Sequence, residues 1–343
     1  MEKTRLGKTE LMVSRTSFGS IPIQRISYEE STNLLRKAYN SGVNFYDTAR
    51  AYGTSENRIG TALSDVRDKI IIATKTLAKT GQDLRADLEK SLSELNTDYI
   101  DIYQLHNPSF VPRPGEADGL YDEALKAKQE GLIRHIGVTS HSLETATEMA
   151  ISGLYETMQF QVNTLSTDDE LKIIDLCKEH DVGFIAMKAM AGGFISNAKS
   201  AFAFMRQFDN VVPIWGVQFM WELEEFLGYE NNPPELNDEI WEIINKDRKE
   251  LAHDFCRCCG YCMPCPVDIN IPMACRAELM IKRVVVSNLV NEGNIAMMRR
   301  INDCTSCNHC IKHCPYNLDT PSILRKQLNY FEAFLKDYEA KNA

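Results

Sequence analysis

The segment V-N-F-Y-D-T-A-R-A-Y-G, residues 43–53, contains side chains that suit proton transfer. Asp47 ends a short apolar run, and Tyr52 follows five residues later in a polar loop. If the run is a strand of a parallel sheet, its carboxyl end is where ligands bind. A tyrosine there acts as a general acid only if its pKa falls from about 10, which a nearby lysine can achieve. Alone, the segment fits an ordinary strand and loop equally well.

Two later residues supply the missing partners. Lys75 follows the strand-like run K-I-I-I-A-T, and His106 follows a predicted strand at 99–105. We predict that Asp47, Tyr52, Lys75 and His106 meet, so that Tyr52 gives its proton to a carbonyl oxygen as hydride reaches the carbon. Lys75, held by Asp47, would lower the pKa of Tyr52, and His106 would orient the substrate oxygen. One such histidine is more often structural, but four suitable residues favour catalysis.

A second group consists of cysteines. Ten of the 11 cysteines lie between residues 256 and 314, which in a reducing compartment points to metal rather than disulfides. The second run has the spacing C-x2-C-x2-C-x3-C-P of bacterial ferredoxins, and the first is a variant one residue shorter. The predicted ligands are Cys256, Cys259, Cys262 and Cys265 in the first run and Cys304, Cys307, Cys310 and Cys314 in the second.

Eight thiolates are enough for two [4Fe–4S] clusters. In a crossed arrangement, the last cysteine of each run serves the other cluster: Cys314 joins Cys256, Cys259 and Cys262, while Cys265 joins Cys304, Cys307 and Cys310. Cys258 and Cys275 are left over, and Cys258 could replace Cys256. A structural zinc site is the alternative, but the proline-terminated double run disfavours it. Cys177 fits a helix core, and His309 and His313 fit exposed positions.

Alternating apolar runs and amphipathic segments organise the rest of the chain. After a hairpin at 5–14, eight predicted strands are each followed by a helix, which favours a (β/α)8 TIM barrel over a doubly wound sheet. The barrel would span 1–230, a linker and connecting helix 231–255, and a helical ferredoxin-like domain 256–343. The predicted strands are 16–20, 43–46, 69–74, 99–105, 133–138, 158–162, 182–187 and 211–215.

These motifs resemble the aldo-keto reductases. The resemblance rests on residues 44–53 with Glu56, on I-I-A-T-K, D-I-Y-Q-L-H and G-V-T-S-H-S, and on M-Q-F-Q-V-N at 158–163. It covers about residues 1–228 and implies NAD(P)H bound across the barrel rim without a glycine-rich phosphate loop. By position, the resemblance assigns the nicotinamide carboxamide to Thr139, Ser140, Gln159 and Asn163, although each also fits a plain polar strand end.

The chain departs from the family pattern in three places. After strand seven, Met187 and Lys188 replace the usual stacking tyrosine and serine; Met187 can pack on a ring, and Lys188 could reach a phosphate. After strand eight, Gln218, Phe219 and Glu222 stand where a small alcohol and two basic residues usually grip the 2′-phosphate of NADPH. Glu222 would repel that phosphate but accept a ribose hydroxyl, so we expect weakened NADPH preference and binding of NADH. The cysteine-rich tail replaces the usual C-terminal substrate loops.

The tail resembles the α-helical dicluster ferredoxin domain of electron-transfer subunits, and the whole chain resembles the iron–sulfur branch of the aldo-keto reductases. One interpretation is a carbonyl reductase whose clusters are structural or redox-sensing. Alternatively, the clusters relay electrons from a redox partner protein to a substrate at the rim, or the barrel is only a docking body. Hydride carries two electrons and a cluster accepts one, so direct exchange needs a flavin or similar gate, and no flavin motif is present.

Bulk properties set the remaining expectations. With 343 residues, 44% hydrophobic content and a net charge of -10, the chain fits a large barrel plus a small domain and disfavours nucleic acid as a partner. It has no apolar run long enough for a membrane span and no apolar signal-peptide core, so we expect a cytoplasmic protein. From the resemblance we expect its substrate to be a small carbonyl compound. Substrate identity and oligomeric state stay open.

Overall fold

The computed structural model describes residues 1–251, 256–257, 260–283, 289–314 and 316–342. The chain divides into two compact units, Met1–Asn245 and Lys246–Ala343. The division falls inside α9 (Asp238–Leu251), which follows an irregular segment at 232–237 that contains Pro233 and Pro234. The domain boundaries expected from the sequence, at 230 and 255, remain predictions.

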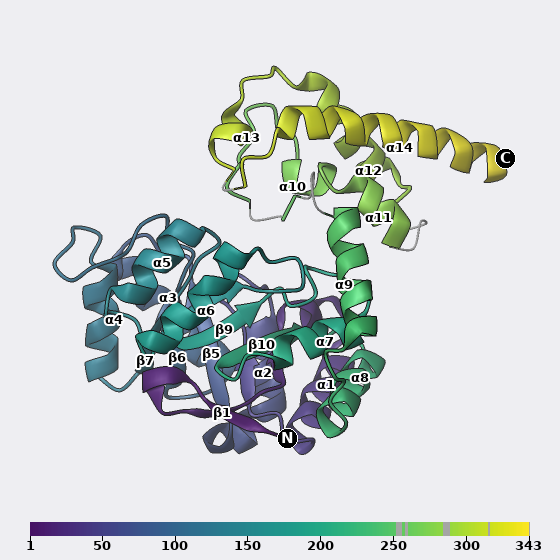
Figure 1. Ribbon diagram of the computed structural model, residues 1–343. Coiled ribbons are helices and arrows are strands. Elements are labelled where there is room, and N and C mark those ends of the chain that lie inside the picture. The colour runs from purple at the N-terminus through teal and green to yellow at the C-terminus, as the bar shows by residue number, and fades with distance from the viewer. Residues whose placement is uncertain (252–255, 258–259, 284–288, 315, 343) are drawn as a thin grey trace. The chain divides into compact units, whose positions relative to one another are not determined.

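The first unit is a closed barrel of eight parallel strands (Figure 1), which confirms the predicted (β/α)8 fold. Each strand pairs with its neighbour in chain order, and the ring closes where β10 pairs with β3, with Trp215 opposite Phe18. The barrel strands are β3 (Ser17–Gly19), β4 (Phe45–Asp47), β5 (Ile71–Thr76), β6 (Ile100–His106), β7 (Ile133–Thr139), β8 (Thr157–Gln161), β9 (Gly183–Met187) and β10 (Val211–Gly216).

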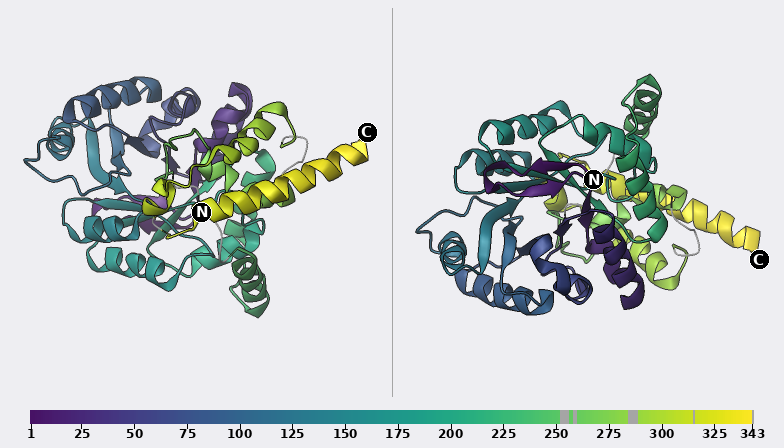
Figure 2. Two further views of the ribbon diagram at one scale, coloured as in Figure 1. Left: turned by 90° about the horizontal axis from the view of Figure 1, so that it is seen from above. Right: turned by 90° about the horizontal axis from the view of Figure 1, so that it is seen from below.

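Helices lie around the strands (Figures 1 and 2), and the local sequence explains where they begin. Ser27 and Glu30 form a reciprocal capping box at the start of α1, and Thr167 and Glu170 form another at α6. The helices are α1 (Tyr28–Asn40), α2 (Ser55–Leu63), α3 (Gly81–Leu95), α4 (Leu120–Gln129), α5 (Leu143–Ile151), α6 (Asp168–Glu179), α7 (Ala198–Arg206) and α8 (Met220–Asn231).

An N-terminal hairpin closes one end of the barrel. Strands β1 (Lys3–Arg5) and β2 (Met12–Ser14) pair antiparallel, and a 3-10 turn at Gly7–Thr9 connects them. Leu6 and Val13 are fully buried in one cluster with Phe45 and Ile102. Phe45 is the first residue of β4 and Ile102 the third of β6, so the cluster lies near the amino ends of these strands. The hairpin lies across that end in the view from below (Figure 2). The hairpin therefore blocks the amino ends of the strands to ligands.

Two strands reach further than the sequence suggested. Lys75 lies within β5 and His106 is the last residue of β6, whereas both were expected just after their strands. The parallel ladder extends through them, because Lys75 pairs with Gln104 and His106 with Thr139. Placing these residues on strands rather than loops fixes the direction of their side chains more firmly.

The second unit is helical and has its own core. Ile269, Ile271, Leu324 and Phe331 are buried there together with the thiols of three cysteines, Cys262, Cys275 and Cys310. Across the described residues of the whole chain, no helix is long and apolar enough to cross a membrane. Its helices are α10 (Ile271–Ala274), α11 (Ala277–Arg283), α12 (Glu292–Arg299), α13 (His309–Lys312) and α14 (Thr320–Asn342), with a 3-10 turn at Arg300–Asp303.

Candidate functional site

A buried ion pair lies at the centre of the barrel rim. The Lys75 ammonium donates to Asp47 Oδ1 at 2.6 Å and to the carbonyl oxygen of Thr48 at 2.6 Å. Lys75 and Asp47 are only 1% and 2% exposed. The side chains of Gln104 and Gln159 also bond to the Asp47 carboxylate, with Gln104 Nε2 at 3.4 Å from Oδ2. Hydrogen bonds from the protein thus take the place of water around both charged groups.

Burial acts on both charges of this pair. It raises the pKa of the Asp47 carboxyl and lowers the pKa of the Lys75 ammonium, because each charged form loses water. Their mutual attraction and their hydrogen bonds oppose these shifts. Removing either partner would therefore leave the other as an uncompensated buried charge.

Tyr52 and His106 lie next to the ion pair. The Lys75 ammonium is 5.4 Å from the centroid of the Tyr52 ring. The rings of Tyr52 and His106 meet edge to face, with their centroids 5.9 Å apart and an interplanar angle of 83°. The structure therefore brings together all four side chains that the sequence singled out for proton transfer.

The expected effect of Lys75 on Tyr52 is not what the structure gives. Burial raises the pKa of the Tyr52 phenol, and the negative charge of Asp47 raises it further. The prediction that Lys75 lowers this pKa is therefore wrong for this arrangement. Burial and the charge of Asp47 set the direction of the shift. The phenol stays protonated, which is the state that a proton donor needs.

A second buried ion pair supports the loop that carries Tyr52. Arg50 pairs with Glu56, whose other carboxylate oxygen accepts a hydrogen bond from Thr74 Oγ1 at 2.6 Å. The backbone N–H of Arg50 donates to the carbonyl oxygen of Lys75 at 2.9 Å. These contacts tie the loop to β5, so the position of the phenol relative to Lys75 is fixed by the fold.

Two histidines at the rim are held neutral. Burial and the positive charges of Lys75 and Lys79 lower the pKa of His106 to about 3. Burial and the charge of Lys188 lower the pKa of His141 to about 3 as well. Within the described part of the chain, His106 Nδ1 is buried without a hydrogen-bond partner. The sequence assigned no role to His141, although it lies in the motif G-V-T-S-H-S.

Three of the four residues expected at the nicotinamide carboxamide bond to the chain itself. Thr139 Oγ1 accepts the N–H of Asn107 at 2.9 Å, and the Ser140 hydroxyl donates to the carbonyl oxygen of Ser142 at 3.1 Å. Asn163 donates to the Lys188 carbonyl oxygen at 3.1 Å. Gln159 differs: its Oε1 atom is buried with no partner among the described residues. Gln159 is thus the best placed of the four to accept a ligand N–H.

The residues that depart from the family pattern lie at the end of β9 and from the end of β10 into the first turn of α8. Met187 ends β9, and Lys188 follows in the left-handed backbone region with φ of 58°. Glu222 Oε2 accepts the N–H groups of Gln218 at 2.7 Å and Phe219 at 2.9 Å. Glu222 therefore caps the start of α8, an explanation for this carboxylate that needs no nucleotide.

Next to Glu222, the rings of Phe219 and Trp221 stack in an exposed position, with centroids 6.2 Å apart. In this chain, apolar rings thus lie beside Gln218, where the family pattern places basic side chains.

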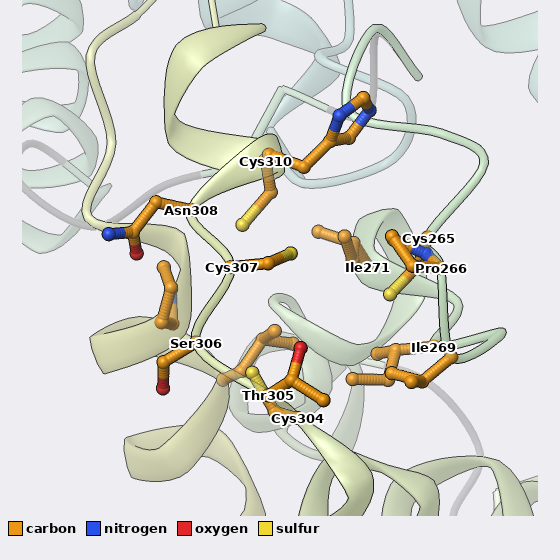
Figure 3. A pocket seen from close by; sticks show the side chains of 14 residues that line it. Cys265, Pro266, Ile269, Ile271, Cys304, Thr305, Ser306, Cys307, Asn308 and Cys310 are labelled. Atoms are coloured by element: carbon orange, nitrogen blue, oxygen red, sulfur yellow. The ribbon is translucent and has the colours of Figure 1, made fainter.

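In the second unit, four cysteines surround one cavity (Figure 3). The sulfur atoms of Cys265, Cys304, Cys307 and Cys310 point toward the same space, which is also lined by Ile269, Ile271 and Leu324. Three of the thiols come from the second run and one from the first, which is the composition of one set in the crossed arrangement. Cys310 is buried and Cys307 is exposed, so the cavity has an inner and an outer side.

Part of the other set can also be located. Cys256 and Cys262 both pack in or against the core of the second unit, and the buried Cys275 lies beside them. Cys314 is half-buried and does not line the cavity around Cys307. The predicted ligand Cys259 and the spare Cys258 lie outside the described residues.

Sequence comparison gives a consistent result for each unit. Residues 16–212 match the model of the aldo/keto reductase family, and residues 255–319 match that of a 4Fe-4S dicluster domain. The second region is thus an iron–sulfur region, and the thiols around the cavity are the donor type that such clusters use.

Individual relatives match the barrel. YqkF of Bacillus subtilis, an uncharacterized oxidoreductase, is 28% identical over 210 residues, which are 57% of this chain and 67% of its own. L-galactose dehydrogenase of Arabidopsis thaliana is 29% identical over 222 residues, with coverage of 57% and 67%. The chain thus spans about two thirds of the length of these relatives. The holo form of AKR11C1 from Bacillus halodurans shares the fold, with a TM-score of 0.63, 22% identity and coverage of 72% and 96%.

Proposed function

Since this chain belongs to the aldo/keto reductase family, a class of NAD(P)-dependent oxidoreductases, we propose that it reduces a small aldehyde or ketone at Asp47, Tyr52, Lys75 and His106. The observation that carries the proposal is the cluster of these side chains at the barrel rim. A 2.6 Å ion pair joins Lys75 to Asp47, and ring contacts join Tyr52 to both Lys75 and His106.

The roles of the residues follow from their protonation states. When bound, NAD(P)H supplies a hydride to the carbonyl carbon. Tyr52, which burial keeps protonated, donates its proton to the oxygen, because the alkoxide that forms there is a stronger base than phenolate. The Lys75 ammonium steadies the negative charge that remains on the phenol oxygen. Neutral His106 offers a ring N–H to the same substrate oxygen and orients it.

The nucleotide would lie across the strand ends. Gln159 supplies an unpaired buried acceptor for the carboxamide N–H, with Thr139, Ser140 and Asn163 forming its surroundings. Met187 packs on the ring, and Lys188 reaches a phosphate. Gln218 and Glu222 offer no cation for a 2′-phosphate, so we propose that NADH binds at least as well as NADPH. Parallel fluorescence titrations test this, and a strong NADPH preference would contradict it.

The second unit would carry two [4Fe–4S] clusters. The cavity bounded by Cys265, Cys304, Cys307 and Cys310 supports the first, since four thiols surround a space. Thiolates are the ligands that hold a [4Fe–4S] cubane at its corners. The second cluster would use Cys256, Cys259, Cys262 and Cys314.

Stopped-flow oxidation of NADH and NADPH with a panel of small aldehydes, under anaerobic conditions, tests the reductase proposal. Tyr52→Phe should lower the rate by about 10²- to 10⁴-fold, because the general acid is lost, while nucleotide binding is unchanged. Tyr103→Phe is the matched control, because Tyr103 is also a buried tyrosine. It neighbours Ile102 on β6, and since successive side chains of a strand point to opposite faces, Tyr103 faces away from the barrel interior. Undiminished reduction by Tyr52→Phe would exclude the proposed roles.

A second candidate function is an electron relay, in which a partner protein delivers electrons through the clusters to a substrate at the rim. The exposure of Cys307 favours it, because a cluster at that cavity would have an edge open to a partner. Cys307→Ala should then abolish turnover with an artificial one-electron donor and leave turnover with NADH or NADPH intact. Equal loss of both activities would contradict a separate relay.

A further inference from the structure

One buried thiol of the second unit has no place among the eight proposed ligands. Cys275 follows α10 directly, is 3% exposed, and shares the core with Cys262 and Cys310. Cys256 packs against the same core, and its sulfur lies within hydrogen-bonding reach of the Cys275 thiol, with Cys262 and Cys310 nearby. The thiol therefore lies against a proposed ligand sulfur, 19 residues away in sequence.

The helical turn before Cys275 holds it in this place. Asn270 caps α10 by accepting the N–H of Met273, and the N–H of Cys275 donates to the carbonyl oxygen of Ile271 at 2.9 Å. Ile271 and Ala274 are buried on the same short helix. The position of the thiol is thus set by the core rather than by a flexible loop.

A donor at a ligand sulfur changes the energetics of a cluster. A [4Fe–4S] cluster gains an electron on reduction, and part of the added negative charge resides on its sulfurs. A hydrogen bond to one of them stabilises the reduced form more than the oxidised form, which raises the reduction potential. The effect is larger in a buried site, where no water competes for the sulfur.

We propose that Cys275 is a positioning residue rather than a ligand, and that its S–H group donates to the Cys256 sulfur and raises the reduction potential of the cluster bound there. This inference rests on the proposed function, because it requires clusters on the two cysteine runs. It predicts that the cluster at Cys256 and Cys262 is easier to reduce than it would be without this thiol.

The test uses the full chain, reconstituted with iron and sulfide under anaerobic conditions. EPR-monitored redox titrations compare wild type with Cys275→Ala and Cys275→Ser, and iron and acid-labile sulfide are measured for each protein. Cys275→Ala should keep the wild-type iron and sulfide content and shift one of the two midpoint potentials downward. Cys275→Ser retains a hydroxyl donor and should hold that midpoint at or above the wild-type value.

Two controls separate the possible results. Cys177→Ala removes an equally buried thiol from α6 of the barrel and should change neither midpoint. Cys256→Ala should lose one cluster. If Cys275→Ala also loses the iron of one cluster, Cys275 is a ligand and the inference is overturned. Unchanged potentials in Cys275→Ala overturn it equally. If wild type itself holds no clusters, the proposed function fails as well, and the iron analysis identifies that case.

Discussion

The barrel rim and the cysteine cavity reach their geometry by different means. At the rim, the charged groups are satisfied by the chain, since Lys75 bonds to Asp47 and to the carbonyl oxygen of Thr48. In the second unit, the thiols of the two runs gather around a space in which, among the described residues, no protein cation faces them. The polypeptide completes the first site, whereas the second needs iron to complete it.

This difference has consequences for stability. The Asp47–Lys75 ion pair forms without any bound ligand, so the folding of the barrel does not depend on metal. Metal bound to four thiolates, by contrast, couples the folding of a small domain to metal binding. We therefore expect the two units to respond differently to the same treatment. All three tryptophans of the chain, Trp215, Trp221 and Trp241, lie in the first unit, so tryptophan fluorescence reports on the barrel alone.

Removal of iron should have the largest effect and should separate the units. After treatment with a chelator and a mild oxidant, residues 246–343 should become sensitive to protease, because their core loses the clusters whose cysteine ligands connect its turns. Mass spectrometry of the fragments locates the cuts. The urea midpoint of the barrel, followed by tryptophan fluorescence, should stay within error of the untreated protein. If the barrel unfolded together with the second unit, the claim that only the second unit depends on iron would be contradicted.

Loss of the rim lysine should have the next largest effect. Lys75→Met leaves the Asp47 carboxylate buried without its counter-charge, so the free energy of unfolding of the barrel should fall by about 3–5 kcal/mol. Urea titration followed by tryptophan fluorescence measures it. The double variant with Asp47→Asn removes both charges and should recover much of the loss. A single variant as stable as wild type would mean that the pair is not charged in the folded barrel.

Acid should act on the barrel through its neutral histidines. His106 has a folded pKa of about 3 and an ordinary value of 6.5, so the unfolded chain takes up the proton first. The stability gained from neutral His106 is complete above pH 6.5 and falls by about 1.4 kcal/mol per pH unit as the pH drops toward 3. His106→Gln should flatten this dependence, whereas His180→Gln, at an exposed position, should not. Parallel slopes for all three proteins would contradict the assignment.

Much of the barrel could be predicted because its signals are local. Short apolar runs alternate with amphipathic segments, such as 28–40 with Leu34, Leu35 and Ala38 on its buried face. Since parallel strands end at the same rim, residues near the ends of β4, β5 and β6 had to come together. The spacing of the second cysteine run likewise indicated three thiols around one space, and the cavity contains all three.

Properties that depend on packing could not be predicted from the sequence. The pKa of Tyr52 depends on how deeply the phenol is buried and on its distance from Asp47, which no motif encodes. The capping role of Glu222 depends on the exact start of α8. The proximity of Cys275 to Cys256 depends on the core of the second unit, in which or against which both residues pack. In each case, a residue type was visible in the sequence but its partner was not.

The seam between β10 and β3 has a consequence for biosynthesis. Ser17 and Ile214 must meet before the ring is complete, so the barrel cannot close until most of its chain has left the ribosome. Every cysteine of the two runs comes after that point in translation. The order of synthesis thus lets the barrel fold before the cysteines of the two runs leave the ribosome.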